Sequence, residues 1–106
     1  IRIGSSFAEP ANRRMLATWL SFDDLASLVR RAIDADRVGC TVVYGASDNP
    51  EQWWDNSKAA FLGWQPQDSS AQFADDPKFR DEVNDPNDPA VRYQGGGFAA
   101  AGHFED

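Results

Sequence analysis

Cysteine and histidine are almost absent from this chain of 106 residues, which contains one of each, Cys40 and His103. One cysteine cannot form an intrachain disulfide, and two isolated residues cannot supply the ligand set of a structural zinc site. The sequence therefore predicts no metal site, and it fits a reducing compartment. A long apolar run and a secretory signal are also missing, so we expect a cytoplasmic protein with no membrane partner.

Basic residues are also scarce: ten Lys and Arg stand against seventeen Asp and Glu, which gives a net charge of −7. A nucleic-acid partner is not expected, because phosphate backbones are bound by clustered cationic side chains. An acidic protein that binds an anion needs a local cation, so individual arginines become informative. The aromatic content of 12% supplies large side chains for a core, so disorder throughout the chain is not expected.

The first half of the chain predicts a strand followed by a helix. Residues 1–5 alternate with strand period, start at an apolar residue other than Met, and look like a strand cut from a longer chain. Residues 15–20 are predicted to be mostly extended. A helix is predicted over 22–35, with Ser21 as its N-cap and Asp24 closing a capping box. Its apolar stripe would comprise Leu25, Leu28, Val29, Ala32 and Ile33.

Asp23 and Asp24 are interpreted as helix-start residues rather than as a catalytic pair, because carboxylates are stabilised at the positive end of a helix.

The second half predicts a further strand and short helices. Residues 40–44 form a continuous β-prone run, which predicts a strand covered on both faces, as in a parallel sheet. A short helix is predicted from Asp55 or Asn56 to Leu62, with Gly63 at its C′ position. Another is predicted to start at residues 75–77, with Phe79 and Val83 pointing inward.

From residue 84 onward the chain is predicted to be a loop, and residues 95–97 (Gly-Gly-Gly) are interpreted as a turn rather than a phosphate-binding loop. The whole pattern predicts an α/β fold of two to three strands and two to three helices. That is too small for a self-sufficient doubly wound sheet, so the chain is expected to need a partner sheet.

Arg14 is the most informative cation. It follows Ser5 across a loop that leaves the end of the predicted first strand. Ligands gather beyond the C-terminal ends of strands in open α/β sheets. A guanidinium at that place can bind a carboxylate through two parallel hydrogen bonds. On residue types alone, however, an arginine on a surface loop is the commoner explanation.

Several motifs carry a resemblance to a known family. Residues 2–10 (Arg-Ile-Gly-Ser-Ser-Phe-Ala-Glu-Pro) resemble the segment after the sixth strand of extended short-chain dehydrogenases. Residues 18–25 resemble the aspartate-capped helix of that superfamily, and residues 62–66 (Leu-Gly-Trp-Gln-Pro) resemble its turn near the end of the chain. Within the NAD-dependent epimerase/dehydratase family, uronate dehydrogenases are the most similar group, through residues 42–47, 53–56 (Trp-Trp-Asp-Asn) and 93–96 (Tyr-Gln-Gly-Gly).

The resemblance covers essentially the whole chain. It implies that residues 1–106 are the C-terminal, substrate-binding portion of a Rossmann-type dehydrogenase whose dinucleotide-binding part is absent. The intact enzyme would use NAD to oxidise D-galacturonate or D-glucuronate at C1 to the aldarolactone, with the preference between the two left open. The glycine-rich loop, the catalytic Ser and the Tyr-x-x-x-Lys motif would lie in the missing N-terminal part. No catalytic residue is therefore expected here, and the chain alone is expected to be inactive. A homo-oligomer is also expected.

The same resemblance assigns site residues. Ser5 and Arg14 would bind the uronate, Arg14 through the C6 carboxylate, while Ile3 and Ser6 would border the nicotinamide of NAD. The adjacent tryptophans at 53 and 54 are interpreted as structural packing rather than as a sugar-stacking platform.

Two alternatives stay open: a nucleotide-sugar epimerase or dehydratase of the same superfamily, and a non-catalytic sugar-acid-binding module. The isolated chain is predicted to be partly unfolded or to associate through an exposed sheet edge.

Overall fold

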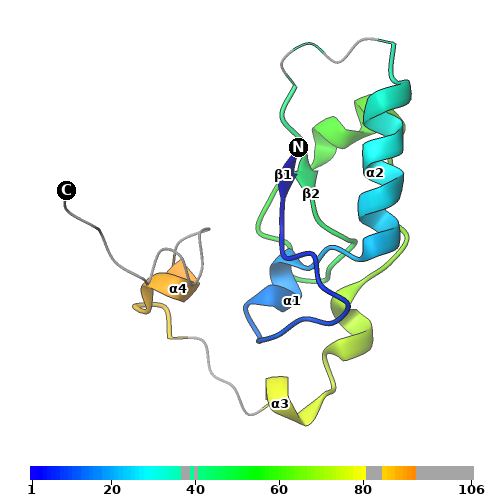
Figure 1. The fold of residues 1–106 in the computed structure, drawn as a ribbon. Helices are drawn as coiled ribbons and strands as arrows, with labels where there is room; N and C mark the ends of the chain where they lie inside the picture. Colours follow the sequence, from blue (N-terminus) through cyan, green and yellow to red (C-terminus); the bar gives the residue numbers. More distant parts are fainter. Residues whose placement is uncertain (37–38, 40, 81–84, 93–106) are drawn as a thin grey trace, which may run out of the picture.

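A computed structural model describes residues 1–36, 39, 41–80 and 85–92, and Figure 1 shows the arrangement of the elements. In chain order they are β1 (Arg2–Ile3), α1 (Met15–Thr18), α2 (Phe22–Asp34), β2 (Tyr44–Gly45), the 3-10 helices η1 (Ser57–Leu62) and η2 (Ser70–Phe73), α3 (Pro77–Arg80) and α4 (Pro89–Arg92). The predicted α/β class is confirmed. The predictions for Cys40, Val83, residues 95–97 and His103 fall outside the described residues.

Helix α2 has the N-cap and nearly the limits that the sequence predicts, but the predicted capping box is wrong, because the backbone N–H of Ser21 donates to Ser47 Oγ and not to Asp24. Ser21 has an extended backbone, and its side-chain oxygen accepts a hydrogen bond from the backbone N–H of Asp24 at 3.0 Å. Leu28 is fully buried, but Val29 and Ile33 of the predicted stripe are 39% and 75% exposed. The buried face of α2 is thus narrower than predicted, because the described elements that pack on it contribute only a small core.

The two strands form a parallel pair, with Arg2 opposite Tyr44 and Ile3 opposite Gly45. The predicted limits of the second strand are wrong: among the described residues of 40–44, only Tyr44 belongs to it. Cover on both faces is also wrong for this segment, because Val42 is 47% exposed while Val43 is 3% exposed. The side chains of this apolar run are therefore buried on one face of the segment and exposed on the other.

Residues 15–20 differ most from their prediction, because the first four of them form the helix α1. Asn12 explains the difference, since its Oδ1 accepts a hydrogen bond from the backbone N–H of Met15 at 3.1 Å at the start of the helix. A short apolar run does not by itself distinguish helix from strand. The chain becomes extended at Trp19, which forms a parallel bridge with Ser5.

The later short helices agree in part with their predictions. The one before Gly63 is confirmed in place but is a 3-10 helix, and Gly63 ends it with a left-handed backbone (φ 68°). The carboxylate of Asp55 accepts a hydrogen bond from the backbone N–H of Ser57 at 3.0 Å, which lowers the pKa of Asp55. Helix α3 carries Phe79 inward as predicted, with 2% of the side chain exposed. Helix α4 corrects the prediction of a loop in its segment, and it begins with a proline, which is favoured at that position.

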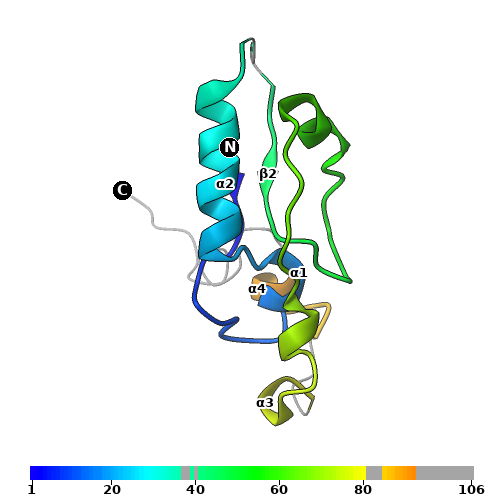
Figure 2. The ribbon, with the colours of Figure 1, turned by 90° about the vertical axis from the view of Figure 1, so that its right-hand side faces the viewer.

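The core lies between α2, η1 and the segment that leads into β2. It consists of Leu28, Val43, Ala59 and Trp64, with Leu62 packed against it. Figure 2 shows β2 between α2 and the segment that carries η1. The indole N–H of Trp64 donates to Ser27 Oγ at 2.9 Å, which ties the exit of η1 to α2. None of the helices in the described ranges is long and apolar enough to cross a membrane.

Candidate functional site

Ser5 begins the loop that leaves β1, and the end of α1 holds it in place. The hydroxyl oxygens of Ser5 and Thr18 lie 2.8 Å apart within hydrogen-bond distance. The backbone N–H of Ser5 donates to the carbonyl of Thr18 at 2.8 Å, and its carbonyl accepts from Leu20 at 3.0 Å. Gly4 permits this close approach, because a Cβ at that position would lie 2.2 Å from the carbonyl oxygen of Thr18. Ser5 is thus fixed by both backbone and side chain.

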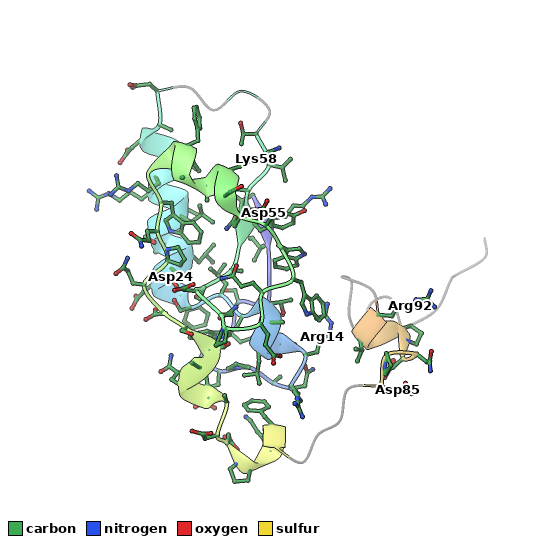
Figure 3. The ribbon with its side chains drawn as sticks, turned by 180° about the vertical axis from the view of Figure 1, so that it is seen from behind. Arg14, Asp24, Asp55, Lys58, Asp85 and Arg92 are labelled. Atoms are coloured by element: carbon green, nitrogen blue, oxygen red, sulfur yellow. The ribbon has the colours of Figure 1, made fainter. Side chains whose placement is uncertain are left out.

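Arg14 lies at the start of the same helix. It has a helical backbone (φ −57°, ψ −39°) at the N-cap position of α1. Residues four apart share one face of a helical turn, so Arg14 shares the face of Thr18, the residue that contacts Ser5. Figure 3 shows Arg14 beside α1, on the side away from α2. The two predicted substrate-binding residues are therefore linked through one helical turn.

The guanidinium of Arg14 lies against an aromatic ring. Its Cζ atom is 4.8 Å from the ring centroid of Trp53, a distance typical of a cation–π contact. Partial burial lowers the pKa of Arg14, because desolvation disfavours the charged form. An arginine nevertheless stays protonated at any physiological pH. Arg14 is thus a partly buried cation in contact with an aromatic ring. It is not the arginine on an open surface loop that residue types alone would favour.

The loop that carries Trp53 follows β2 and is anchored at both ends. On one side, the buried Asn49 donates through Nδ2 to the carbonyl of Trp19 at 2.9 Å and accepts through Oδ1 from the backbone N–H of Ser70 at 3.0 Å. On the other side, Asn56 exchanges two hydrogen bonds with the backbone of Tyr44: Oδ1 accepts from its N–H at 3.0 Å and Nδ2 donates to its carbonyl at 2.7 Å. The sequence indicated Asn56 only as a possible helix start and indicated none of these hydrogen bonds, because the partners of both asparagines are distant along the chain.

The two adjacent tryptophans have different surroundings. Trp54 stacks on the ring of Tyr44, with ring centroids 4.9 Å apart and an interplanar angle of 9°. This contact is the structural packing that the sequence predicts. Trp53 is 41% exposed and contacts Arg14 instead, so the packing interpretation does not describe it.

The two residues predicted to border the cofactor lie at β1 and just beyond its end. Ile3 is the last residue of β1 and is 58% exposed. Ser6 has a buried hydroxyl oxygen for which the described residues provide no hydrogen-bond partner. A buried hydroxyl without a partner is destabilising, which fits a place where a bound group supplies the missing hydrogen bond.

Asp24 has a structural surrounding, in agreement with its interpretation as a helix-start residue. Its side chain is 2% exposed. Oδ2 accepts from Ser47 Oγ at 2.6 Å and from the backbone N–H of Asp68 at 3.1 Å, and Oδ1 accepts from the backbone N–H of Gln67 at 2.8 Å. In the described part of the chain, no three His, Cys, Asp or Glu side chains are grouped as metal ligands would be.

Comparisons with known proteins extend over nearly the whole chain. No family model matches the sequence. A curated uronate dehydrogenase from Pseudomonas syringae pv. tomato is 55% identical over 106 residues, which are 100% of this chain and 38% of that protein. The crystal structure of a glucuronic acid dehydrogenase from Chromohalobacter salexigens is 59% identical with a TM-score of 0.85, over 96% of this chain and 38% of that one.

A second similar structure is a mutant of the uronate dehydrogenase from Agrobacterium tumefaciens in complex with NAD. It is 47% identical with a TM-score of 0.84, over 99% of this chain and 40% of that one. The chain thus spans between 38% and 40% of the length of these relatives.

Proposed function

We propose that this chain, a homologue of the uronate dehydrogenases over 38% of their length, forms the substrate-recognising part of an NAD-dependent dehydrogenase that oxidises D-galacturonate or D-glucuronate. The rest of the enzyme would correspond to the portion of the relatives that this chain does not span. That portion would carry the glycine-rich loop, the catalytic Ser and the Tyr-x-x-x-Lys motif. The NAD complex of the Agrobacterium relative supports the choice of cofactor.

The observation that carries the proposal is the position of Arg14. A chain with a net charge of −7 must bind an anionic sugar through a local cation. Arg14 is partly buried against Trp53. It lies on the same face of the helix as Thr18, whose hydroxyl contacts Ser5. A guanidinium can donate two parallel hydrogen bonds to a carboxylate, here the C6 carboxylate of the uronate. The hydroxyl of Ser5 keeps hydrogen-bonding capacity beyond its bond to Thr18 and would bind a sugar oxygen.

On this proposal, the chain contributes orientation rather than bond-making chemistry. Holding the C6 carboxylate at Arg14 fixes which carbon of the sugar faces the reacting groups, and alignment of this kind lowers the barrier without any proton transfer. When bound, NAD would supply the hydride acceptor for C1, and the tyrosine of the Tyr-x-x-x-Lys motif in the missing portion would take the proton of the C1 hydroxyl, which would give the aldarolactone. Ser6 and the backbone around Ile3 would border the nicotinamide, and the buried, unpartnered hydroxyl of Ser6 supports this assignment.

Arg14 would also select for charged substrates. A neutral hexose lacks the carboxylate, so the partly buried guanidinium of Arg14 would lose the two hydrogen bonds that a uronate supplies, which costs about 1–3 kcal/mol. That penalty corresponds to between about fivefold and about 150-fold in kcat/KM.

The test uses the full-length enzyme that carries this chain and follows NADH formation with galacturonate, glucuronate and galactose. We expect turnover of both uronates but not of galactose. The Arg14→Ala variant should lose about tenfold or more in kcat/KM for the uronates, and Arg14→Lys should recover only part of it, because lysine keeps the charge but not the two-pronged geometry. Arg13→Ala is the matched control, since it removes the same charge from the adjacent, exposed position.

An equal loss in Arg13→Ala and Arg14→Ala would refute a specific clamp and indicate a general effect of charge. Absence of turnover with either uronate would refute the proposed substrate, and nucleotide sugars would then be tested.

A further inference from the structure

Trp53 and Arg14 form a contact between two segments that are distant in the sequence. Arg14 begins α1, whereas Trp53 lies in the loop after β2. The ring contact is made at the central carbon Cζ of the guanidinium, 4.8 Å from the ring centroid. The N–H groups of a guanidinium point outward in its plane, so the ring face covers the central carbon without itself using those donors.

The position of Trp53 is set by the residues on either side of it. Asn49 joins the start of the loop to the carbonyl of Trp19, just after α1, so the loop and α1 are held in a fixed relation. The next residue after Trp53, Trp54, is stacked on Tyr44, and Asn56 is bonded to the Tyr44 backbone. The ring of Trp53 is therefore presented to Arg14 by a loop that the rest of the fold immobilises.

An arginine side chain has many rotamers, and fixing one of them on ligand binding lowers affinity. A ring that holds the guanidinium beforehand removes part of this cost, as with any preorganised binding group. The partial burial that lowers the pKa of Arg14 fits a guanidinium that is already covered on one side.

We propose that Trp53 is a positioning residue for the carboxylate clamp: it orients the guanidinium of Arg14 for the uronate carboxylate and does not itself touch the sugar. This inference rests on the proposed function of Arg14. It assigns Trp53 a role distinct from that of Trp54, whose stacking on Tyr44 is structural.

A double-mutant cycle in the full-length enzyme tests the inference. The variants are Trp53→Leu, Arg14→Ala and the combination, with steady-state kinetics on galacturonate at saturating NAD. We expect Trp53→Leu to raise KM about fivefold with little change in kcat, in the range of one cation–π contact. Trp53→Phe keeps an aromatic face and should show a smaller rise. In the Arg14→Ala background, Trp53→Leu should have no further effect, because the group that it positions is gone.

Phe61→Leu serves as the control for loss of an exposed aromatic ring, since Phe61 is 63% exposed on η1. Its KM should equal that of the wild type, and thermal midpoints of all variants should show that Trp53→Leu and Trp53→Phe remain folded.

Two results would overturn the positioning role while leaving the clamp intact. One is an unchanged KM in Trp53→Leu together with a clear defect in Arg14→Ala. The other is a KM effect of Trp53→Leu that persists in the Arg14→Ala background, which would indicate direct contact with the sugar or a structural role. A wild-type kcat/KM in Arg14→Ala would instead refute the clamp itself, and the role of Trp53 with it.

Discussion

The hydroxyl of Ser47 joins the end of β2 to the first turn of α2 by donating to Oδ2 of Asp24 over 2.6 Å. The same hydroxyl accepts a hydrogen bond from the backbone N–H of Ser21 at 3.0 Å. In a reciprocal capping box the carboxylate at N3 would accept that N–H itself. Because Ser47 accepts that N–H instead, the carboxylate of Asp24 can accept from Gln67 and Asp68. The Asp24 side chain thus connects α2, the segment after β2 and residues 67–68.

Replacing Asp24 by Asn should destabilise the protein. The carboxylate accepts three hydrogen bonds, whereas an amide would place donor hydrogens against at least one of the same donors. We expect a loss of about 2 kcal/mol in the free energy of unfolding. Asp23→Asn removes the same charge from the same helix turn at an exposed position, and its loss should be about 0.5 kcal/mol. Urea denaturation of the full-length enzyme measures both, and equal losses would contradict a structural role for the network.

Replacing Gly4 by Ala should disrupt the contact between β1 and α1. A Cβ at this position would lie 2.2 Å from the carbonyl oxygen of Thr18 and 2.9 Å from that of Gly45, both backbone atoms. We expect a loss of about 2 kcal/mol or more. Gly45→Ala is the control from the paired strand, because its nearest neighbour would be the end of the Leu20 side chain at 3.1 Å. The thermal midpoint should fall clearly more in Gly4→Ala, and the reverse order would contradict the described approach of β1 to α1.

Replacing Asn56 by Asp should be destabilising although the two side chains have the same shape. A carboxylate can still accept from the N–H of Tyr44 but cannot donate to its carbonyl, so two oxygens would face each other. We expect a loss of about 1–2 kcal/mol. The same substitution at Asn12 should be neutral or slightly stabilising, because Asn12 accepts from Met15 at the start of α1, where a negative charge is favourable. Thermal midpoints that fall equally in both variants would contradict this assignment.

Features that depend on neighbouring residues were predictable from the sequence. Ser21 caps a helix through a residue three positions later, and Gly63 ends a short helix through its own backbone freedom. Met15–Thr18 was mispredicted because a short apolar run has no decisive period and the deciding hydrogen bond comes from Asn12.

Contacts between distant segments were not predictable in this way. The resemblance to a family indicated Ser5 and Arg14, but nothing in the spacing of residues indicated that Trp53 would lie against Arg14 or that Ser47 would bind Asp24. A single tryptophan, serine or asparagine in a loop has many possible partners, and only tertiary packing selects one. The homo-oligomer and the cytoplasmic location stay predictions, as does inactivity of the chain alone.

The hydrogen bonds between Asn56 and Tyr44 leave the small sheet with one edge, that of β1, at which a further strand can pair. At Tyr44 the outward N–H and carbonyl of β2 are both occupied by the amide of Asn56, while no strand in the described ranges lies beyond β1. Any strand added to this sheet must therefore enter beside β1. If two copies of the chain paired through their β1 edges, neither sheet would have an open edge left, and assembly would end at a dimer. A sheet open at both edges could instead add copies without limit.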